Sequence, residues 1–373
     1  MHKMRVQKDY AQKEIRLMED KQDIRQGIRS LRLYQPVEEK PWGFEQIMIG
    51  HDSCRYTASA TNIRDALLFD LGELVLTDSA CFLGPYHASI LGESSDLFPV
   101  MVKELLIQKG EQLSFQVHPT YCFTRSHYDD CSYQKDEVWI VLDADADAEF
   151  YSGLRLKGSV VDYGAISMLA ASGTMRKLAY VSKPQRGDMY FIPAGTLHGA
   201  RGYMRVLGLS PNVDRTMRAH DDYGRATHLV EHPDAVETLL PAVRIPRCVD
   251  ARYKNYGRSL STPFRVGTYI SDQMRLPNET EPVWWGRHGE PIAFGLLYCE
   301  SECWLEGLKF IAGMHVLPHD LVGKMFKTTT PFQYGQPGLR DLLCVASVSE
   351  RTLSDSSYML KQQTHYREKG TPF

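Results

Sequence analysis

Short apolar runs separated by polar turns set the fold class of this 373-residue chain. Such runs occupy residues 44–49, 66–71, 73–77, 100–107, 138–142 and 189–192. Many short strands with frequent turns are typical of an all-β sandwich or barrel. The same texture returns after residue 262, with strands expected at 264–270, 292–299, 303–310 and 342–348. Two stacked β-barrels of related shape would produce this repetition, so the sequence predicts a mainly β protein.

Two segments break the β pattern. Residues 3–32 are rich in Lys, Arg, Glu, Gln, Leu and Met and contain no Gly or Pro before Gly27, which favours a helix. This helix could pack on the body or on another subunit, or it could be a frayed charged helix. Residues 226–240 also read as helical and acidic, and a short helix is expected at 166–171. We therefore predict an N-terminal helical arm (1–35), a catalytic β domain (36–225), a helical connection (226–261) and a C-terminal β domain (262–373).

Composition excludes several function classes. Hydrophobic residues make up 43% and charged residues 24%, and the net charge is −3 with Lys and Arg spread along the chain, so nucleic acid is not an expected partner. No apolar run is long enough to predict a membrane span. The N-terminus lacks an apolar signal-peptide core, and the eight cysteines form no CxxC pair. These features predict a cytoplasmic protein with reduced thiols.

The stretch from residue 113 to 119 is the first candidate for chemistry. Side chains alternate across a strand, so its apolar and polar residues fall on opposite faces. The apolar face carries Leu113, Phe115 and Val117, and the polar face carries Ser114, Gln116 and His118. A barrel strand can pack with one face and bind with the other, although a polar face can also simply be solvated.

Two further clusters lend weight to a binding site. Lys135 and Glu137 share one face at the start of the strand 138–142, and His198 follows a tight turn at 193–196. With Gln116 and His118, this gives two imidazoles, one carboxylate and one amide oxygen. Such a mixed N/O set suits Zn²⁺, with Fe²⁺, Mn²⁺ or Co²⁺ as alternatives. Each residue alone has a simpler structural explanation; the combination predicts a metal site.

The sequence resembles type I mannose-6-phosphate isomerases in four ordered blocks. These blocks are 98–103 with 113–119 (LSFQVHP), 135–144 (KDEVWIVLDA), 187–198 (GDMYFIPAGTLH) and 212–225. The resemblance covers residues 40–225 and implies cupin (jelly-roll) barrels, with residues 226–373 in the position of the family's C-terminal cupin-like half. It also implies one divalent metal, most simply Zn²⁺, on Gln116, His118, Glu137 and His198.

The resemblance also implies an activity, the interconversion of mannose 6-phosphate and fructose 6-phosphate through an enediol. The family's active-site lysine falls on Lys135, its arginine on Arg218, and the serine associated with the substrate phosphate on Ser114. Arg218, always charged, suits phosphate or enediolate binding. Lys135, Asp214 and a metal-bound water are all candidates for the general base.

The chain departs from the family pattern at three places. Thr120 stands where an acidic residue commonly follows His-Pro, the loop from residue 121 to 134 is long and polar, and the segment 72–75 lacks the family's Trp. The alternatives are therefore a cupin isomerase or epimerase of another, unphosphorylated sugar, and a non-catalytic sugar-binding cupin. The retained ligand set with Lys135 and Arg218 favours an enzyme. His315 and His319 are interpreted as structural, and a homo-oligomer is possible.

Overall fold

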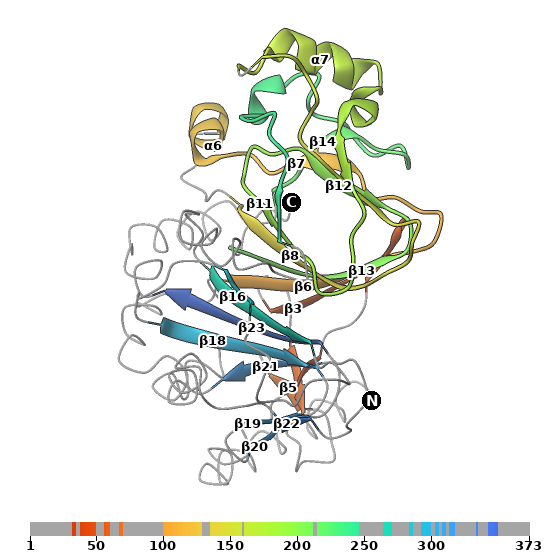
Figure 1. Ribbon diagram of the computed structural model, residues 1–373. Coiled ribbons are helices and arrows are strands. Elements are labelled where there is room, and N and C mark those ends of the chain that lie inside the picture. Colours follow the sequence, from red (N-terminus) through yellow and green to blue (C-terminus); the bar gives the residue numbers. More distant parts are fainter. Residues whose placement is uncertain are drawn as a thin grey trace, which may run out of the picture.

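The structure is a computed structural model, and Figure 1 shows its ribbon. It describes residues 32–34, 38–49, 56–59, 67–69, 100–128, 135–158, 160–211, 215–245, 264–270, 283–285, 292–299, 303–305, 308–310, 313–317, 333–334 and 342–349. Nearly all of the elements in these ranges are strands, and every pairing between named strands is antiparallel. The prediction of a mainly β protein is confirmed.

A seven-stranded and a five-stranded sheet form the part of the molecule that holds the candidate site (Figure 1). The larger sheet has the order β15-β11-β8-β13-β6-β3-β2, and the smaller has the order β10-β9-β12-β7-β14. The larger contains β2 (Glu38–Lys40), β3 (Gly43–Ile49), β6 (Val100–Ile107), β8 (Glu137–Ala144), β11 (Met189–Ile192), β13 (Met204–Pro211) and β15 (Val243–Ile245). The smaller contains β7 (Phe115–Val117), β9 (Glu149–Ser152), β10 (Tyr180–Ser182), β12 (His198–Arg201) and β14 (Met217–His220).

An apolar core lies between these two sheets and draws side chains from both. Its buried members include Leu105, Leu113, Trp139, Val141, Phe150, Tyr190, Ala200 and Val206. The Trp139 and Phe150 rings meet edge to face at 5.5 Å between centroids, and Phe150 lies 4.2 Å from Tyr190. Because alternate residues of β8 point to opposite faces, Glu137 shares the inward face with Trp139 and Val141. The Glu137 carboxylate therefore lies at one end of this apolar core.

A second core covers the opposite face of the five-stranded sheet. It includes Phe115 and Val117 of β7, together with residues of four helical segments. These segments are α6 (Tyr121–Tyr128), α7 (Tyr163–Ala171), and the short 3-10 helices η3 (Met175–Leu178) and η4 (Pro233–Ala235). Leu113 was expected on this face but packs between the sheets, since β7 begins only at Phe115.

Five strands after residue 262 and three strands from residues 32–69 form an eight-stranded sheet with the order β17-β16-β23-β18-β21-β1-β4-β5 (Figure 1). These strands are β1 (Arg32–Tyr34), β4 (Tyr56–Ser59), β5 (Leu67–Phe69), β16 (Phe264–Ile270), β17 (Val283–Trp285), β18 (Ile292–Cys299), β21 (Gly313–Leu317) and β23 (Leu342–Ser349). A small sheet, β20-β19-β22, contains β19 (Cys303–Leu305), β20 (Leu308–Phe310) and β22 (Gln333–Tyr334). Arg205 of β13 donates to the Tyr298 hydroxyl of β18 at 2.9 Å and so joins the two larger sheets.

The helical predictions had mixed outcomes. The helix expected at 166–171 is confirmed as the longer α7, whose Asp162 cap accepts from the Ala165 N–H. The helical arm lies outside the described residues up to residue 31, and residues 32–34 instead form β1, which pairs with β4 and β21. No helix of the described residues is long and apolar enough to cross a membrane.

Two local predictions were wrong. The helix expected at 226–240 is absent: this described segment consists of turns with one 3-10 turn, η4. Pro233 and Pro241 explain the difference, because the residue before a proline is biased away from the α region. The polar loop expected from residue 120 to 134 begins instead with α6. Thr120 caps it, since its hydroxyl oxygen accepts from the Phe123 N–H at 3.4 Å and its carbonyl accepts from the Thr124 N–H at 3.0 Å.

Candidate metal centre

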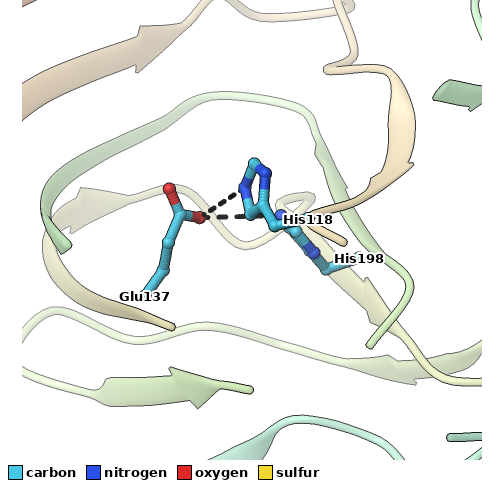
Figure 2. Close-up of side chains that lie close together, drawn as sticks. All are labelled: His118, Glu137 and His198. Carbon is cyan, nitrogen blue, oxygen red and sulfur yellow. Dashed lines mark ion pairs between the residues drawn. The ribbon is translucent and has the colours of Figure 1, made fainter. Parts of the chain in front are cut away.

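Three predicted ligands meet between the two sheets, as Figure 2 shows. His118 follows β7, Glu137 opens β8 and His198 opens β12. Glu137 Oε2 lies 3.2 Å from His118 Nε2 and 3.6 Å from His198 Nε2. All three are buried, with exposed fractions of 1% for His118, 3% for Glu137 and 0% for His198. The residues form one of the groups within the described ranges whose ligand atoms are close enough to share a metal ion.

Strand register explains why residues so distant in sequence converge. Gln116 of β7 pairs with His198 of β12 on one side and with Arg218 of β14 on the other. Directly opposed residues of antiparallel strands present their side chains on the same face. On the facing sheet, Glu137 pairs with Ile192, immediately before the turn that leads to His198. The site therefore has contributions from both sheets at one end of the core.

Backbone carbonyls fix the orientation of both imidazoles. His118 Nδ1 lies 2.8 Å from the Arg215 carbonyl oxygen, and His198 Nδ1 lies 3.0 Å from that of Thr196. A carbonyl can only accept, so each Nδ1 carries the proton and each Nε2 presents a lone pair. Both Nε2 atoms are buried and lack a hydrogen-bond partner, although they point at the Glu137 carboxylate. Two lone pairs facing a carboxylate make an arrangement that a cation would satisfy.

Electrostatics keep this group in its metal-binding protonation state. Burial lowers the pKa of His198 to about 3, and burial together with the Lys135 charge lowers the pKa of His118. Burial alone would raise the pKa of Glu137, but Lys135 and the two histidines hold it well below its usual value. Neutral imidazoles and an ionised carboxylate are the forms that bind a divalent metal.

Two neighbours complete the surroundings of Glu137. The Lys135 ammonium lies 3.0 Å from Glu137 Oε1, and Lys135 is only 1% exposed. The Trp139 indole donates to Glu137 Oε2 at 3.1 Å, and its ring meets the His198 ring edge to face. Lys135 and Trp139 thus hold the carboxylate in place, each through a different one of its two oxygens.

Gln116 and Ser114 lie on the inward face, as predicted. Both are buried, and the Ser114 hydroxyl donates to Gln116 Oε1 at 2.7 Å. An amide oxygen has two lone pairs, so this bond orients Gln116 and leaves one lone pair for another partner.

Arg218 projects from β14 beside Gln116, while Asp214 lies outside the described residues. The backbone at Arg218 is held by His228: the Arg218 N–H donates to His228 Nδ1 at 3.0 Å, and the His228 N–H donates to the Arg218 carbonyl at 2.7 Å. Sequence reasoning missed His228. The only signal available was an isolated histidine in a segment misread as a helix.

The turn before His198 requires glycine. Gly195 has φ +78°, and a Cβ there would lie 2.8 Å from Glu237 Cβ and 3.2 Å from Thr120 Cγ2. The Glu237 N–H donates to the Gly195 carbonyl at 3.0 Å, and the Thr120 hydroxyl donates to the Glu237 carboxylate. A carboxylate is therefore present beside the position after His-Pro: Glu237 supplies it from a distant segment, in contact with Thr120. No sequence pattern predicted the contact between Thr120 and Glu237.

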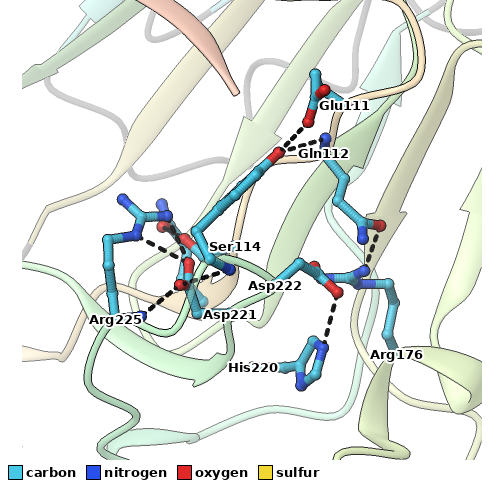
Figure 3. Close-up of polar contacts among 10 residues, drawn as sticks. Glu111, Gln112, Ser114, Arg176, His220, Asp221, Asp222 and Arg225 are labelled. Atoms are coloured by element: carbon cyan, nitrogen blue, oxygen red, sulfur yellow. Dashed lines mark hydrogen bonds and ion pairs between the residues drawn. The ribbon is translucent and has the colours of Figure 1, made fainter. Parts of the chain in front are cut away.

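A network of hydrogen bonds and ion pairs includes His220 of β14, the strand that carries Arg218, as Figure 3 shows. Its members include Glu111, Gln112, Arg176, His220, Asp221, Asp222, Tyr223 and Arg225. The Tyr223 hydroxyl donates to Glu111 at 2.6 Å, and Arg176 donates to Asp222 at 2.7 Å. These bonds join the segment after β14 to the approach to β7 and to η3. The fourth sequence block thus includes the supports of the site.

Part of this sequence is shared with curated mannose-6-phosphate isomerases. No protein-family model matches the chain. Mannose-6-phosphate isomerase of Streptococcus mutans is 27% identical over 186 residues, which cover 48% of this chain and 56% of that protein. A probable mannose-6-phosphate isomerase of Bacillus subtilis is 30% identical over 136 residues, 36% of this chain and 41% of that protein. The chain spans about half the length of the curated relatives it matches.

Solved structures show a shared fold over a larger part of the chain. The mannose 6-phosphate isomerase of Bacillus subtilis has a TM-score of 0.55 at 19% identity and covers 84% of this chain and 98% of its own. The apo enzyme of Salmonella typhimurium has a TM-score of 0.56 at 14% identity, with coverage of 86% and 99%. A structure described as the zinc-bound holo form of mannose 6-phosphate isomerase has a TM-score of 0.54 at 13% identity, with coverage of 85% and 99%. The resemblance to type I mannose-6-phosphate isomerases is confirmed.

Proposed function

We propose that this protein is a zinc-dependent isomerase that interconverts mannose 6-phosphate and fructose 6-phosphate. The observation that carries the proposal is the buried triad of His118, Glu137 and His198, in which two proton-free Nε2 atoms face an ionised carboxylate. The sequence relatives are named for this activity, and one structural neighbour is described as zinc-bound. A cytoplasmic location fits the exposed free thiol of Cys122.

The residues present fit a divalent metal. Two imidazoles, one carboxylate and the Gln116 amide oxygen would hold it, and Zn²⁺ accepts this N/O set. Such an ion, when bound, would supply Lewis-acid charge and orientation for the sugar oxygens at C1 and C2. Ser114 would keep the Gln116 oxygen in place through its 2.7 Å hydrogen bond. The proposed contact of Ser114 with the substrate phosphate would compete with this Ser114–Gln116 hydrogen bond.

Proton transfer and the stabilisation of developing charge would be carried out by side chains of this chain. A base removes the proton from C2, the C1 oxygen gains a proton to give the enediol, and the proton is returned to C1 as the C2 hydroxyl becomes a ketone. Lys135 and Asp214 are the proposed proton-transfer groups. Arg218 would stabilise the negative charge of the enediolate or hold the phosphate, because its guanidinium stays charged. Lys135, 3.0 Å from Glu137, would add positive charge from the other side.

The proposed domain organisation follows the same family. We propose that the five- and seven-stranded sheets form one cupin barrel and that the eight-stranded sheet belongs to a second. Residues 226–261 would connect them, without the expected helix in their described part. The shared fold over 84% of the chain supports this division.

A substrate panel tests the function. Zinc-loaded protein is assayed with mannose 6-phosphate in a coupled assay for fructose 6-phosphate, and in parallel with free mannose, lyxose and fructose. We expect turnover only with the sugar phosphate. Turnover of a free sugar alone would favour an isomerase of unphosphorylated sugars. Binding of sugar without turnover would favour a non-catalytic cupin. Lys135→Met and Asp214→Asn then separate the two proton-transfer candidates.

A further inference from the structure

A second group of metal-ligating side chains lies where α6 meets the segment around η4. It consists of His127 on α6, His232 at the N-cap of η4 and Asp234 within η4. One ligand atom from each lies within 4.8 Å of the others. These three residues form the α6 cluster. None of its residues contributes to the buried centre of His118, Glu137 and His198.

The orientation of His127 resembles that of the buried histidines. Its Nδ1 lies 3.1 Å from the Phe123 carbonyl oxygen one turn earlier, an atom that can only accept. The Ser126 hydroxyl, 2.9 Å from the same Nδ1, donates its own proton to that carbonyl and so accepts from the ring. The Nδ1 proton is therefore drawn to that side, and Nε2 faces Asp234 Oδ2 at 3.1 Å. Either the ring holds a second proton, or the nitrogen and the oxygen share a cation.

Both imidazoles of the α6 cluster are positioned by one buried aromatic ring. Phe123 is 4% exposed; His127 stacks on it at 4.1 Å and His232 meets it edge-on at 5.9 Å. The backbone of His232 is fixed as well, since its N–H donates to the His228 carbonyl at 2.9 Å. A surface ion pair needs no such arrangement of a second imidazole, whereas a metal site requires its ligands to be held close together.

The distances and ligand types define the class of ion. Ligands about 2.1 Å from a tetrahedral ion lie roughly 3.4 Å apart. The His127–Asp234 separation of 3.1 Å is close to this value, and the third ligand atom lies within 4.8 Å of both. Imidazole with carboxylate selects borderline ions such as Zn²⁺, Co²⁺ or Ni²⁺ over Mg²⁺ or Ca²⁺. Partial exposure would leave the fourth position to water.

We propose that His127, His232 and Asp234 form a second divalent transition-metal site, of lower affinity than the buried centre. Its position gives it a structural consequence. Helix α6 begins three residues after His118, and the segment that includes His232 also supplies His228, which holds the Arg218 backbone, and Glu237, which binds Thr120. A bound ion would tie these two segments together beside the buried centre.

Metal counting by equilibrium dialysis tests the site. Purified apoprotein is dialysed against micromolar free Zn²⁺, and bound zinc is measured by mass spectrometry. We expect His232→Ala and Asp234→Asn each to bind one ion fewer per chain than the unmodified protein. A His232→Ala/Glu137→Gln double variant should lose two. Asp234→Asn removes no volume, so it guards against a folding defect, and circular dichroism checks every variant.

His220→Ala is the matched control. Like His127, His220 is partly exposed and faces an aspartate, with His220 Nε2 3.0 Å from Asp222 Oδ1, but no second imidazole accompanies this pair in the described residues. It should leave the zinc count unchanged. The count should also fall in Glu137→Gln independently of the α6 cluster, so failure of one site is distinguishable from failure of the other. Equal counts in the unmodified protein, His232→Ala and Asp234→Asn would overturn the proposal and leave a simple ion pair.

Discussion

The buried centre and the α6 cluster have the same chemical groups in two different surroundings. Each has two imidazoles and one carboxylate, and the closest N–O distance is 3.2 Å in the buried centre and 3.1 Å in the α6 cluster. The side chains of the buried centre are at most 4% exposed, whereas those of His127 and Asp234 are 28% and 35% exposed. We propose that this difference in burial separates their roles, with tighter metal binding and chemistry on a substrate at the buried centre, from which water is excluded.

The supporting elements differ as well. The buried ligands stand at the ends of β7, β8 and β12, which come from both facing sheets, and Lys135, Trp139 and two backbone carbonyls fix them. The α6 cluster joins a short helix to a 3-10 turn and has one aromatic ring as its main support. Removal of one partner from a buried charged group leaves an uncompensated charge, which costs about 3–5 kcal/mol, while an exposed pair contributes about 0–1 kcal/mol.

Glu137→Gln is expected to have the largest effect. The amide removes the negative charge that would bind the divalent ion beside the two Nε2 lone pairs, so the tightly bound zinc and the isomerase activity should both be lost. Zinc content and turnover are measured on the same preparation. Glu149→Gln, a carboxylate of β9 that is paired with Lys183 and Arg201, is the control and should keep both properties. Full metal and full turnover in Glu137→Gln would show that the buried group is not the site.

Arg218→Ala should separate catalysis from metal binding at the buried centre. The variant should retain zinc but lose turnover by about 10²–10³-fold, the usual effect of removing one donor to a developing oxyanion. Steady-state kinetics with mannose 6-phosphate measures the loss. Arg201→Ala, at the exposed end of β12, is the matched arginine control and should have no effect on turnover. Unchanged kinetics in Arg218→Ala would remove this residue from the mechanism.

The stability of the metal-free protein should depend on pH through the buried centre. The pKa of His198 is about 3 in the folded state, so between about pH 6.5 and 3 the unfolded chain binds a proton that the folded chain does not. Stability should therefore fall as the pH falls through this window, and the lowered pKa of His118 acts in the same direction. Urea unfolding at a series of pH values measures the slope. The slope should be smaller in His198→Ala, and an unchanged slope in that variant contradicts the assignment.

Phe123→Leu should have the smallest effect, confined to the α6 cluster. Leucine keeps most of the apolar volume but removes the ring on which His127 stacks and against which His232 packs, so the α6 cluster should bind zinc several-fold more weakly. Competition with a zinc-sensitive dye in the Glu137→Gln background isolates this site. Zinc bound at the buried centre of the otherwise unmodified protein should not change. An unchanged affinity at the α6 cluster would show that the ring does not position the imidazoles.

Local pattern accounts for the part of the buried centre that was predicted. Alternation along one strand placed Ser114, Gln116 and His118 on one face. Glu137 at a strand start and His198 after a tight turn completed the set, and the family resemblance implied the same four ligands. Short apolar runs likewise located most strands of the described sheets, because the side-chain period of a strand is visible in the sequence. The ligand set required no knowledge of distant contacts beyond the order of the blocks.

The parts that were missed depend on contacts between distant segments. Glu237 contacts Thr120, which lies more than a hundred residues earlier in the chain. His228 hydrogen-bonds the Arg218 backbone from a segment that was predicted to be a helix. Composition favoured helix there, but two prolines and the burial of Ala235 and Val236 against the second core decided otherwise. The α6 cluster was missed for the same reason, since one ligand lies in a predicted loop and two in the misread segment.

Stoichiometric zinc titration of the apoprotein, with activity on mannose 6-phosphate measured at each addition, tests the buried centre most directly. Turnover should rise in proportion to the first equivalent of zinc and then remain constant while the α6 cluster fills. In Glu137→Gln, turnover should remain absent at every ratio of zinc to protein. A fully zinc-loaded, folded protein without turnover, or activity that appears only with later equivalents, would contradict the assignment of the isomerase site to His118, Glu137 and His198.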